Sequence, residues 1–476
     1  MKKQNVFQNR KIGKRILCGA LAFMLFIGNA KVSAQAEEYW PDAGAVPSGC
    51  ATVIEVDTGT ILYSQNGDEV GYPASITKVL TALLAIENCE MDEIITFSDA
   101  AVDNNEGDTS HIFRDYGEQM TVEQCLYAAL LFSANECAYA LGEHVGEKLG
   151  GDYQTFIDLM NKRASDLGCT HTHFANANGL PDENHYTTTH DMALIAADAY
   201  KNETFRIIDG TRTYRIPPTN KHEEETPLYN QHLMYYPSSS AKYIYEYCTG
   251  GKTGFTDAAG NTLVTYAEKD GMRLACVVMK SSRPQHYVDT INLMDFCFNN
   301  FQIVNIADNE KSITQESLKN TGILNNNETF TSIDRNALIV IPATATFDEV
   351  KSKIETKDVK KGAIAEINYT YASHEVGAAE IMAKLSTIPE NVFQKPVDQE
   401  AEDNDEVRTV KVKIWWIVAV VFAVALVAVA IFFGKKLIDN FYWIRHNMEV
   451  KKKRKERFRA KHEKKKRRRK KDRLFH

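Results

Sequence analysis

Metal-binding patterns are absent from this sequence of 476 residues. It contains no His-Glu-x-x-His motif, and its nine cysteines include no Cys-x-x-Cys pair. We therefore expect a site that uses neither a metal ion nor another cofactor. Four histidines lie close together in the sequence, but without that motif we interpret them as loop residues. They are His171, His173, His185 and His190.

Acidic residues are missing from the first 34 positions, which carry seven Lys and Arg side chains. The basic start is followed by an apolar stretch from Ile16 to Ile27 and then by small residues. This order predicts a secretory signal peptide over residues 1–34, with cleavage after Ala34 or Ala36. The apolar part is too short to favour a retained membrane anchor.

Long uncharged runs are rare in the chain, and the one over residues 414–433 is long enough to cross a bilayer core of about 30 Å. Residues 434–476 follow it as a basic tail, which is almost continuously basic from Lys451 to Lys471. By the positive-inside rule we expect this tail to be cytoplasmic, beside anionic lipid headgroups rather than nucleic acid. The acidic segment 35–413, with a net charge of −29, would then lie outside the cell. We expect a single-pass protein of the cell membrane.

No spacing assigns disulfides to the cysteines that would remain after signal cleavage. Several of them sit in apolar runs, as Cys276 does in LACVVM, so buried free thiols are the first interpretation. One or two disulfides stay open because the segment is exported. The eight are Cys50, Cys89, Cys125, Cys137, Cys169, Cys248, Cys276 and Cys297.

A serine and a lysine three residues apart stand at the start of an apolar run that has helical spacing. Ser75 and Lys78 would share one face of a helix beginning near Ser75, close enough to exchange a proton. The helix N-terminus would favour a developing oxyanion at the serine. Taken alone, such a match is more often a helix cap and a surface lysine.

Two further elements follow in order, Ser133-Ala134-Asn135 at a break in a helix and Lys252-Thr253-Gly254 before a hairpin. Each is common by itself, but the ordered set with Ser75-x-x-Lys78 is specific to penicillin-binding proteins and class A β-lactamases. Burial and the nearby cation of Lys252 would lower the pKa of Lys78 and so make its amine a base for Ser75.

The wider sequence resembles the low-molecular-mass penicillin-binding proteins, the serine-type D-alanyl-D-alanine carboxypeptidases. Besides the three motifs, the loop Phe174–Leu180 and the segment Gly254–Gly260 look like signatures of this family. The resemblance covers roughly residues 45–300. Two positions depart from it, because Ala134 replaces the usual Gly and Glu136 the usual Asp.

The resemblance implies an acyl-enzyme on Ser75, formed from the stem peptide of peptidoglycan with release of the terminal D-alanine, and acylation of the same serine by β-lactams. It implies that Ser133 relays a proton and that the backbone N–H groups of Ser75 and Phe255 form the oxyanion hole. The expected catalytic residues are Ser75, Lys78 and Ser133, and the expected substrate-binding residues are Asn135, Lys252, Thr253, Gly254, Phe255 and Arg283.

Strands at both ends of the catalytic segment and helices between them predict an α+β fold around an antiparallel sheet, the penicillin-binding or β-lactamase-like transpeptidase fold. A small β-rich domain and one transmembrane helix would follow. The expected segments are a signal peptide (1–34), a catalytic domain (40–301), a β-rich accessory domain (302–393), an acidic linker (394–413), a transmembrane helix (414–433) and a basic tail (434–476).

Three alternatives stay open. A D,D-endopeptidase or transpeptidase would differ only in the acceptor that reaches the acyl-enzyme. A class A β-lactamase would need a Glu-x-x-Leu-Asn element before Lys-Thr-Gly, and the similar stretch 316–320 has the wrong spacing and follows Lys252. A non-turnover β-lactam sensor is the alternative from a different class of function.

Overall fold

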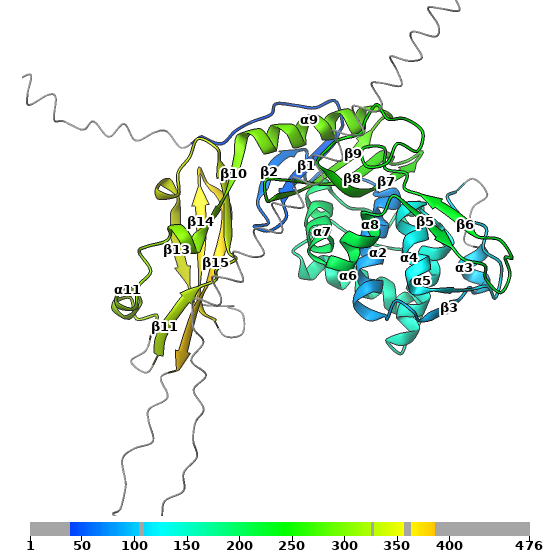
Figure 1. Ribbon diagram of the computed structural model, residues 1–476, viewed down its shortest axis with the longest axis horizontal. Coiled ribbons are helices and arrows are strands. Elements are labelled where there is room, and N and C mark those ends of the chain that lie inside the picture. Colours follow the sequence, from blue (N-terminus) through cyan, green and yellow to red (C-terminus); the bar gives the residue numbers. More distant parts are fainter. Residues whose placement is uncertain (1–38, 104–108, 325–327, 357–362, 386–476) are drawn as a thin grey trace, which may run out of the picture. The chain divides into compact units, whose positions relative to one another are not determined.

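The computed structural model describes residues 39–103, 109–324, 328–356 and 363–385 (Figure 1). The segments predicted as signal peptide, acidic linker, transmembrane helix and basic tail lie outside these residues. Among the residues that are described, no helix is long and apolar enough to cross a membrane.

A five-stranded antiparallel sheet forms the centre of the part that carries the motifs. It has strand order β2-β1-β9-β8-β7, so strands from both ends of this part meet in one sheet, as the sequence predicted. A tight turn at Asp270 and Gly271, both at positive φ, joins β8 to β9. The strands are β1 (Cys50–Glu55), β2 (Ile61–Gln65), β7 (Cys248–Thr256), β8 (Gly260–Lys269) and β9 (Met272–Ser281).

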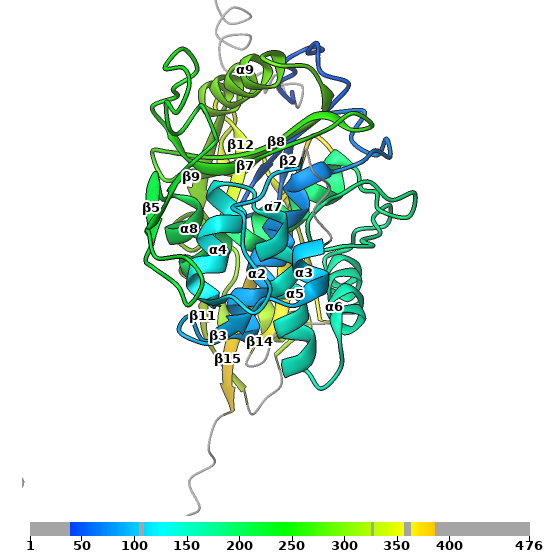
Figure 2. The ribbon, with the colours of Figure 1, turned by 90° about the vertical axis from the view of Figure 1, so that its right-hand side faces the viewer.

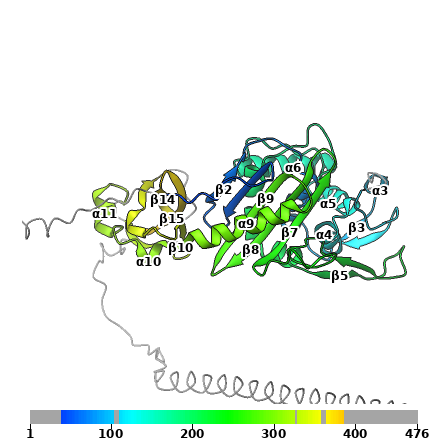
Figure 3. The ribbon, with the colours of Figure 1, turned by 90° about the horizontal axis from the view of Figure 1, so that it is seen from above.

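Helices cover both faces of this sheet because its strands are apolar on both sides. In β9, Ala275 and Val277 face one apolar core, and Leu274 and Cys276 face the other. The C-terminal helix α9 lies across β8 and β9 on the second face (Figure 3). The other helices gather on the first face (Figure 2).

Along the chain, most helices of this part lie between the two groups of strands, as predicted. A 3-10 turn, η1 (Ala74–Thr77), precedes the first long helix, so Ser75 lies one turn before an α-helix rather than in it. The predicted break in the second helical stretch separates α4 from α5. The helices are α2 (Lys78–Asn88), α3 (Asp99–Asp103), α4 (Val122–Leu131), α5 (Asn135–Lys148), α6 (Tyr153–Asp166), α7 (Thr189–Lys201), α8 (Glu203–Asp209) and α9 (Gln285–Asn300).

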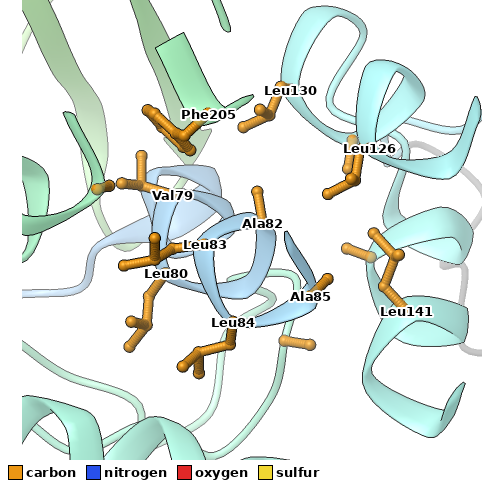
Figure 4. Close-up of a cluster of buried hydrophobic side chains, with 14 of the residues drawn as sticks. Val79, Leu80, Ala82, Leu83, Leu84, Ala85, Leu126, Leu130, Leu141 and Phe205 are labelled. Atoms are coloured by element: carbon orange, nitrogen blue, oxygen red, sulfur yellow. The ribbon is translucent and has the colours of Figure 1, made fainter. Parts of the chain in front are cut away.

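Helix α2 lies inside the helical layer and holds the catalytic turn in place. All its residues from Lys78 to Ala85 are buried, so the helix is enclosed around its whole circumference. Figure 4 shows Val79 beside Phe205 of α8. It also shows Ala82 and Ala85 on the side of α2 that faces α4 and α5. A helix enclosed in this way gives the residues at its start one fixed position.

Two small hairpins lie outside the main sheet and were not predicted. One pairs β3 with β4, and the other pairs β5 with β6. Their strands are β3 (Ile94–Thr96), β4 (Gln119–Thr121), β5 (Thr213–Ile216) and β6 (Thr226–Tyr229).

The region after α9 is rich in strands and has its own apolar core. It contains a two-stranded sheet, β10-β12, and a four-stranded sheet of order β11-β15-β14-β13. That this region is an accessory domain stays a prediction. Its elements are β10 (Phe301–Asn305), α10 (Ile306–Asn309), α11 (Gln315–Asn320), β11 (Glu328–Ile333), β12 (Leu338–Pro342), η2 (Phe347–Glu349), β13 (Lys351–Glu355), β14 (Ala363–Tyr371) and β15 (His374–Leu385).

Candidate active site

Ser75 is presented by a constrained turn at the N-terminal end of α2. Its neighbour Ala74 has φ +52°, a conformation that costs an L-residue of order 1 kcal/mol and is found mostly at functional sites. Gly179 packs so closely against Ala74 that a Cβ on it would overlap the Ala74 carbonyl oxygen. Ser75 itself is half-buried and faces a pocket.

Lys78 is completely buried and reaches the serine. Its Nζ lies 3.1 Å from Ser75 Oγ, 2.7 Å from Asn135 Oδ1 and 2.6 Å from the carbonyl oxygen of Asn178. Burial lowers the pKa of Lys78 far below its usual value, and the charge of Lys252 lowers it further.

The three partners of this amine are chemically unequal. The oxygens of Asn135 and Asn178 only accept hydrogen bonds, whereas Ser75 Oγ also carries a proton. A neutral amine has two N–H bonds and one lone pair. It donates the two to the acceptors and directs the lone pair at the serine hydroxyl, which is the arrangement of a general base and its nucleophile.

The Ser133 motif lies between α4 and α5, at the predicted helix break. Ser133 has φ +66°, and its Oγ lies 3.0 Å from the Nζ of Lys252. Asn135 begins α5, and its backbone N–H donates to the carbonyl oxygen of Ser110, 2.9 Å away. The motif therefore joins two of the lysines in the site, Lys78 through Asn135 and Lys252 through Ser133.

Strand β7 carries the Lys-Thr-Gly motif along the free edge of the main sheet. Gly254 is needed there, because a Cβ on it would lie 2.9 Å from the backbone nitrogen of Ser75 and would overlap Thr262 Oγ1. The next residue, Phe255, is 61% exposed. An unpaired strand edge beside a nucleophile can bind an extended peptide as an additional strand.

Lys252 is almost completely buried, and its Nζ donates to Ser133 Oγ and, at 2.7 Å, to the carbonyl oxygen of Thr253. Burial lowers its pKa to about 7, against the opposing effect of Asp209. The ammonium thus lies behind Ser133 and Thr253 rather than at the pocket wall. Direct contact of Lys252 with a substrate carboxylate stays a prediction.

A pocket of about 1050 Å³ opens at Ser75. Seven of the nine expected site residues line it, and the two lysines lie beneath its surface. Arg283 is among the seven, although the family motifs did not place it clearly. The seven are Ser75, Ser133, Asn135, Thr253, Gly254, Phe255 and Arg283.

The sequence analysis missed several residues of this pocket. Ser110, Gln231 and Tyr287 line it, but they come from segments without a recognisable motif. The role of Asn178 as an acceptor for Lys78 was also missed, although Asn178 lies in the quoted family loop. A backbone carbonyl leaves no signal in a sequence.

The four clustered histidines form two groups: His171 and His190 both contact Asp191, and His173 lies near His185. His185 is buried, and its Nε2 lies 2.8 Å from Thr77 Oγ1; burial lowers its pKa to about 3, so it is neutral and supports the catalytic turn. His190 pairs with Asp191.

Elsewhere in the described residues, two groups of side chains are of the types that bind metal ions, Cys89-Glu93-His144 and Asp115-Glu118-His222. The carboxylates of Glu93 and Glu118 are already paired with Lys148 and Arg114.

Comparisons with known proteins agree with this geometry. The family model described as D-alanyl-D-alanine carboxypeptidase, Peptidase S11, matches residues 34–283. D-alanyl-D-alanine carboxypeptidase DacF of Bacillus subtilis is 30% identical over 276 residues, which are 56% of this chain and 67% of DacF. The D-alanyl-D-alanine endopeptidase of Escherichia coli is 26% identical over 295 residues, 59% of this chain and 87% of its own length.

A solved structure is also similar. The DD-transpeptidase of Streptomyces K15 superposes with a TM-score of 0.50 at 28% sequence identity, covering 54% of this chain and 100% of that chain. The range matched by the family model, residues 34–283, contains all three motifs. On the family match and the arrangement around Ser75, the chain belongs to the D-alanyl-D-alanine carboxypeptidase family, the serine peptidases of the penicillin-binding fold.

Proposed function

We propose that this protein is a serine-type D-Ala-D-Ala carboxypeptidase that removes the terminal D-alanine from the stem pentapeptide of peptidoglycan. The observation that carries the proposal is the buried Lys78 amine, which has two carbonyl acceptors and the Ser75 hydroxyl around it. The names of the related proteins support the substrate class.

In the acylation step, Ser75 Oγ forms a bond to the carbonyl carbon of the penultimate D-Ala while its proton passes to the neutral Lys78 amine. The backbone N–H groups of Ser75 and Phe255 bind the oxyanion, a contribution of about 3 kcal/mol for each donor. The peptide C–N bond then breaks, Ser133 gives its proton to the leaving nitrogen, and the Lys78 ammonium returns a proton to Ser133. Free D-Ala leaves.

In the deacylation step, water attacks the ester carbonyl and gives a proton to the neutral Lys78 amine. The C–O bond to Ser75 then breaks, and the Lys78 ammonium returns the proton to Ser75 Oγ. Thr253 and Arg283 bind the terminal carboxylate of the substrate, with the Lys252 ammonium behind them. Gly254 allows the substrate backbone to lie along the edge of β7. β-Lactams acylate Ser75 in the same way and act as inhibitors.

The acceptor of the acyl group decides between this reaction and its closest alternatives. With a crosslinked peptide as substrate the same steps give D,D-endopeptidase activity, and with an amine acceptor they give transpeptidation. A class A β-lactamase activates its water with a glutamate. Of the described residues that line the pocket, Asp257 alone is acidic, and this favours a peptidase over a β-lactamase.

The test is release of D-alanine from a pentapeptide that ends in D-Ala-D-Ala by the full chain and by Ser75→Ala. We expect the variant to lose both D-alanine release and labelled-penicillin binding. Ser239→Ala, which removes a hydroxyl from the same pocket, should keep both. Acylation without D-alanine release by the unmodified protein would indicate a β-lactam sensor and contradict the proposal.

We further propose that the site works outside the cell, with the chain anchored by residues 414–433 and the basic tail on anionic lipid at the cytoplasmic face. The charge pattern of the sequence supports this topology. Protease added outside intact cells should remove the penicillin-binding part and leave the tail. If the penicillin-binding part is protected from the protease, this topology is contradicted.

A further inference from the structure

A buried carboxyl group lies close to the Lys-Thr-Gly strand without any role in the steps above. Asp209 is the last residue of α8 and is 1% exposed. Among the described residues, no side chain hydrogen-bonds either of its carboxyl oxygens, and the backbone N–H of Gly251 is the one donor that acts on them. A buried carboxylate without partners destabilises a fold, and a negative charge at a helix C-terminus adds to this cost.

The backbone of β7 is adapted to this side chain. A Cβ on Gly250 would overlap Asp209 Oδ2, so only glycine leaves room for the carboxyl group. Gly250 and Lys252 are two apart in a strand and point to the same face, roughly 7 Å from each other. The carboxyl group therefore occupies the side-chain position next to Lys252, on the face of the sheet that carries the active site.

The other ionisable groups around this pair cannot replace the carboxylate. His232, which packs on Gly251, is held neutral because burial lowers its pKa to about 3. Tyr266 pairs with Gly250 across the sheet, and burial raises the pKa of its hydroxyl. Tyr200, on α7, and Cys248, on β7, also have raised pKa values. Lys78 is neutral in the resting site, because burial and Lys252 lower its pKa far below the usual value.

Asp209 and Lys252 thus stabilise each other's charged form in an environment that disfavours both. Burial raises the pKa of Asp209 to about 7, offset in part by Lys252 and by the Gly251 N–H. The pKa of Lys252 is lowered to about the same value, offset by Asp209. Two such groups titrate as a pair. Glu136 acts on Lys78, whereas it is not among the groups that shift the pKa of Asp209 or Lys252.

We propose that Asp209 is a positioning residue of the active site, whose carboxylate against Gly250 keeps the Lys252 ammonium charged and directed at Ser133. The inference rests on the proposed function, because it assigns Asp209 a part in acylation. The Lys252 charge lowers the pKa of the Lys78 amine and attracts the carboxylate of the incoming substrate. Without Asp209, Lys252 would lose its proton at a lower pH.

The matched variant is Asp209→Asn, which keeps the shape of the side chain and removes its charge. The measurement is the rate of Ser75 acylation by a labelled penicillin from pH 5 to pH 10, together with the thermal midpoint. We expect the alkaline limb of the rate profile to shift to lower pH by about one unit, because Lys252 loses the negative charge that helps to keep it protonated. We also expect a thermal midpoint that is unchanged or a few degrees higher at pH 8.

The sign of the stability effect follows from the raised pKa of Asp209. Ionised Asp209 costs stability above the pKa that it has in the unfolded chain, and this cost is absent at lower pH. The variant should therefore gain stability relative to the unmodified protein as the pH rises from 4 through 7. If Asp209 only supported the fold, the variant would instead lose stability relative to the unmodified protein as the pH rises.

Asp289→Asn is the control, because it alters another buried Asp, on α9, which hydrogen-bonds Ser48. It should lower the thermal midpoint and leave the pH profile in place. If Asp209→Asn does not fold, Asp209→Ser, which is smaller, is measured in the same way. An alkaline limb that stays in place in a folded Asp209 variant overturns the inference. If the unmodified protein is not acylated at any pH, the proposed function fails instead.

Discussion

At the scale of single residues, the site depends on the charge state of lysines that the fold removes from water. Lys78 has no exposed surface, and its pKa lies far below the usual lysine value because of burial and because of Lys252. A lysine becomes a base only when such an environment removes its proton at working pH. In this protein the helical core around Lys78 and the pocket above it provide that environment.

Lys78→Met should therefore abolish acylation of Ser75 while keeping the fold. We expect at least a 100-fold lower rate with penicillin, since the serine loses its general base. The thermal midpoint should stay the same or rise, because a buried amine is replaced by an apolar side chain of similar length. Lys162→Met, at an exposed position of α6, serves as the control. A variant that retains the full rate would exclude Lys78 as the base.

Arg283 lines the pocket and is exposed, so its effect should appear in substrate binding. Arg283→Gln is expected to raise KM about tenfold for peptides with a free terminal carboxylate, with a smaller effect on kcat. For a peptide with an amidated C-terminus, the variant should have the same KM and kcat as the unmodified protein. Arg215→Gln, on β5, is the control. Equal losses for both peptides would show that Arg283 does not bind the carboxylate.

At the scale of the elements, the site is made by the approach of η1 and β7, and Gly254 sets how close they come. Gly254→Ala would place a methyl group 2.9 Å from the Ser75 nitrogen. We expect it to push β7 away from the serine, to lower the acylation rate by 100-fold or more, and to cost about 1–3 kcal/mol of stability. Normal acylation and an unchanged thermal midpoint would contradict the close approach.

Much of this arrangement was predictable from local patterns. The two N-terminal strands, the interrupted helix pair α4–α5 and the β8–β9 hairpin each have a period or a turn sequence that identifies them. The β5–β6 hairpin was missed because its strands are four residues long, and a polar loop separates them. The proximity of Ser75 and Lys78 followed from their spacing.

Contacts between distant segments had no such signal. The hydrogen bond from Lys252 to Ser133 joins residues 119 positions apart, and no period or motif specifies it. The place of Asp209 beside β7 is set by the packing of a short helix, and only the adjacent Gly250 and Gly251 hint at a close approach. The motif set identified the chemistry, and the tertiary structure shows which charges act on it.

At the scale of the whole molecule, the eight cysteines from Cys50 to Cys297 are buried free thiols, as the sequence analysis first interpreted them. Native protein alkylated with iodoacetamide should remain unlabelled at these positions, and all eight should react after unfolding without a reductant. Peptide mass spectrometry checks both states. Peptides joined by a disulfide would contradict the structure.

The central claim is that Lys78 is neutral when it meets the serine hydroxyl, and NMR titration of its side chain tests this most directly. In the unmodified protein with ¹³C-labelled lysine, the Cε signal that disappears in Lys78→Met should titrate well below the range of exposed lysines, whose pKa is about 10.4. A Lys78 signal that titrates with the exposed lysines would mean that the amine is protonated at working pH. It would contradict the assignment of Lys78 as the base that activates Ser75.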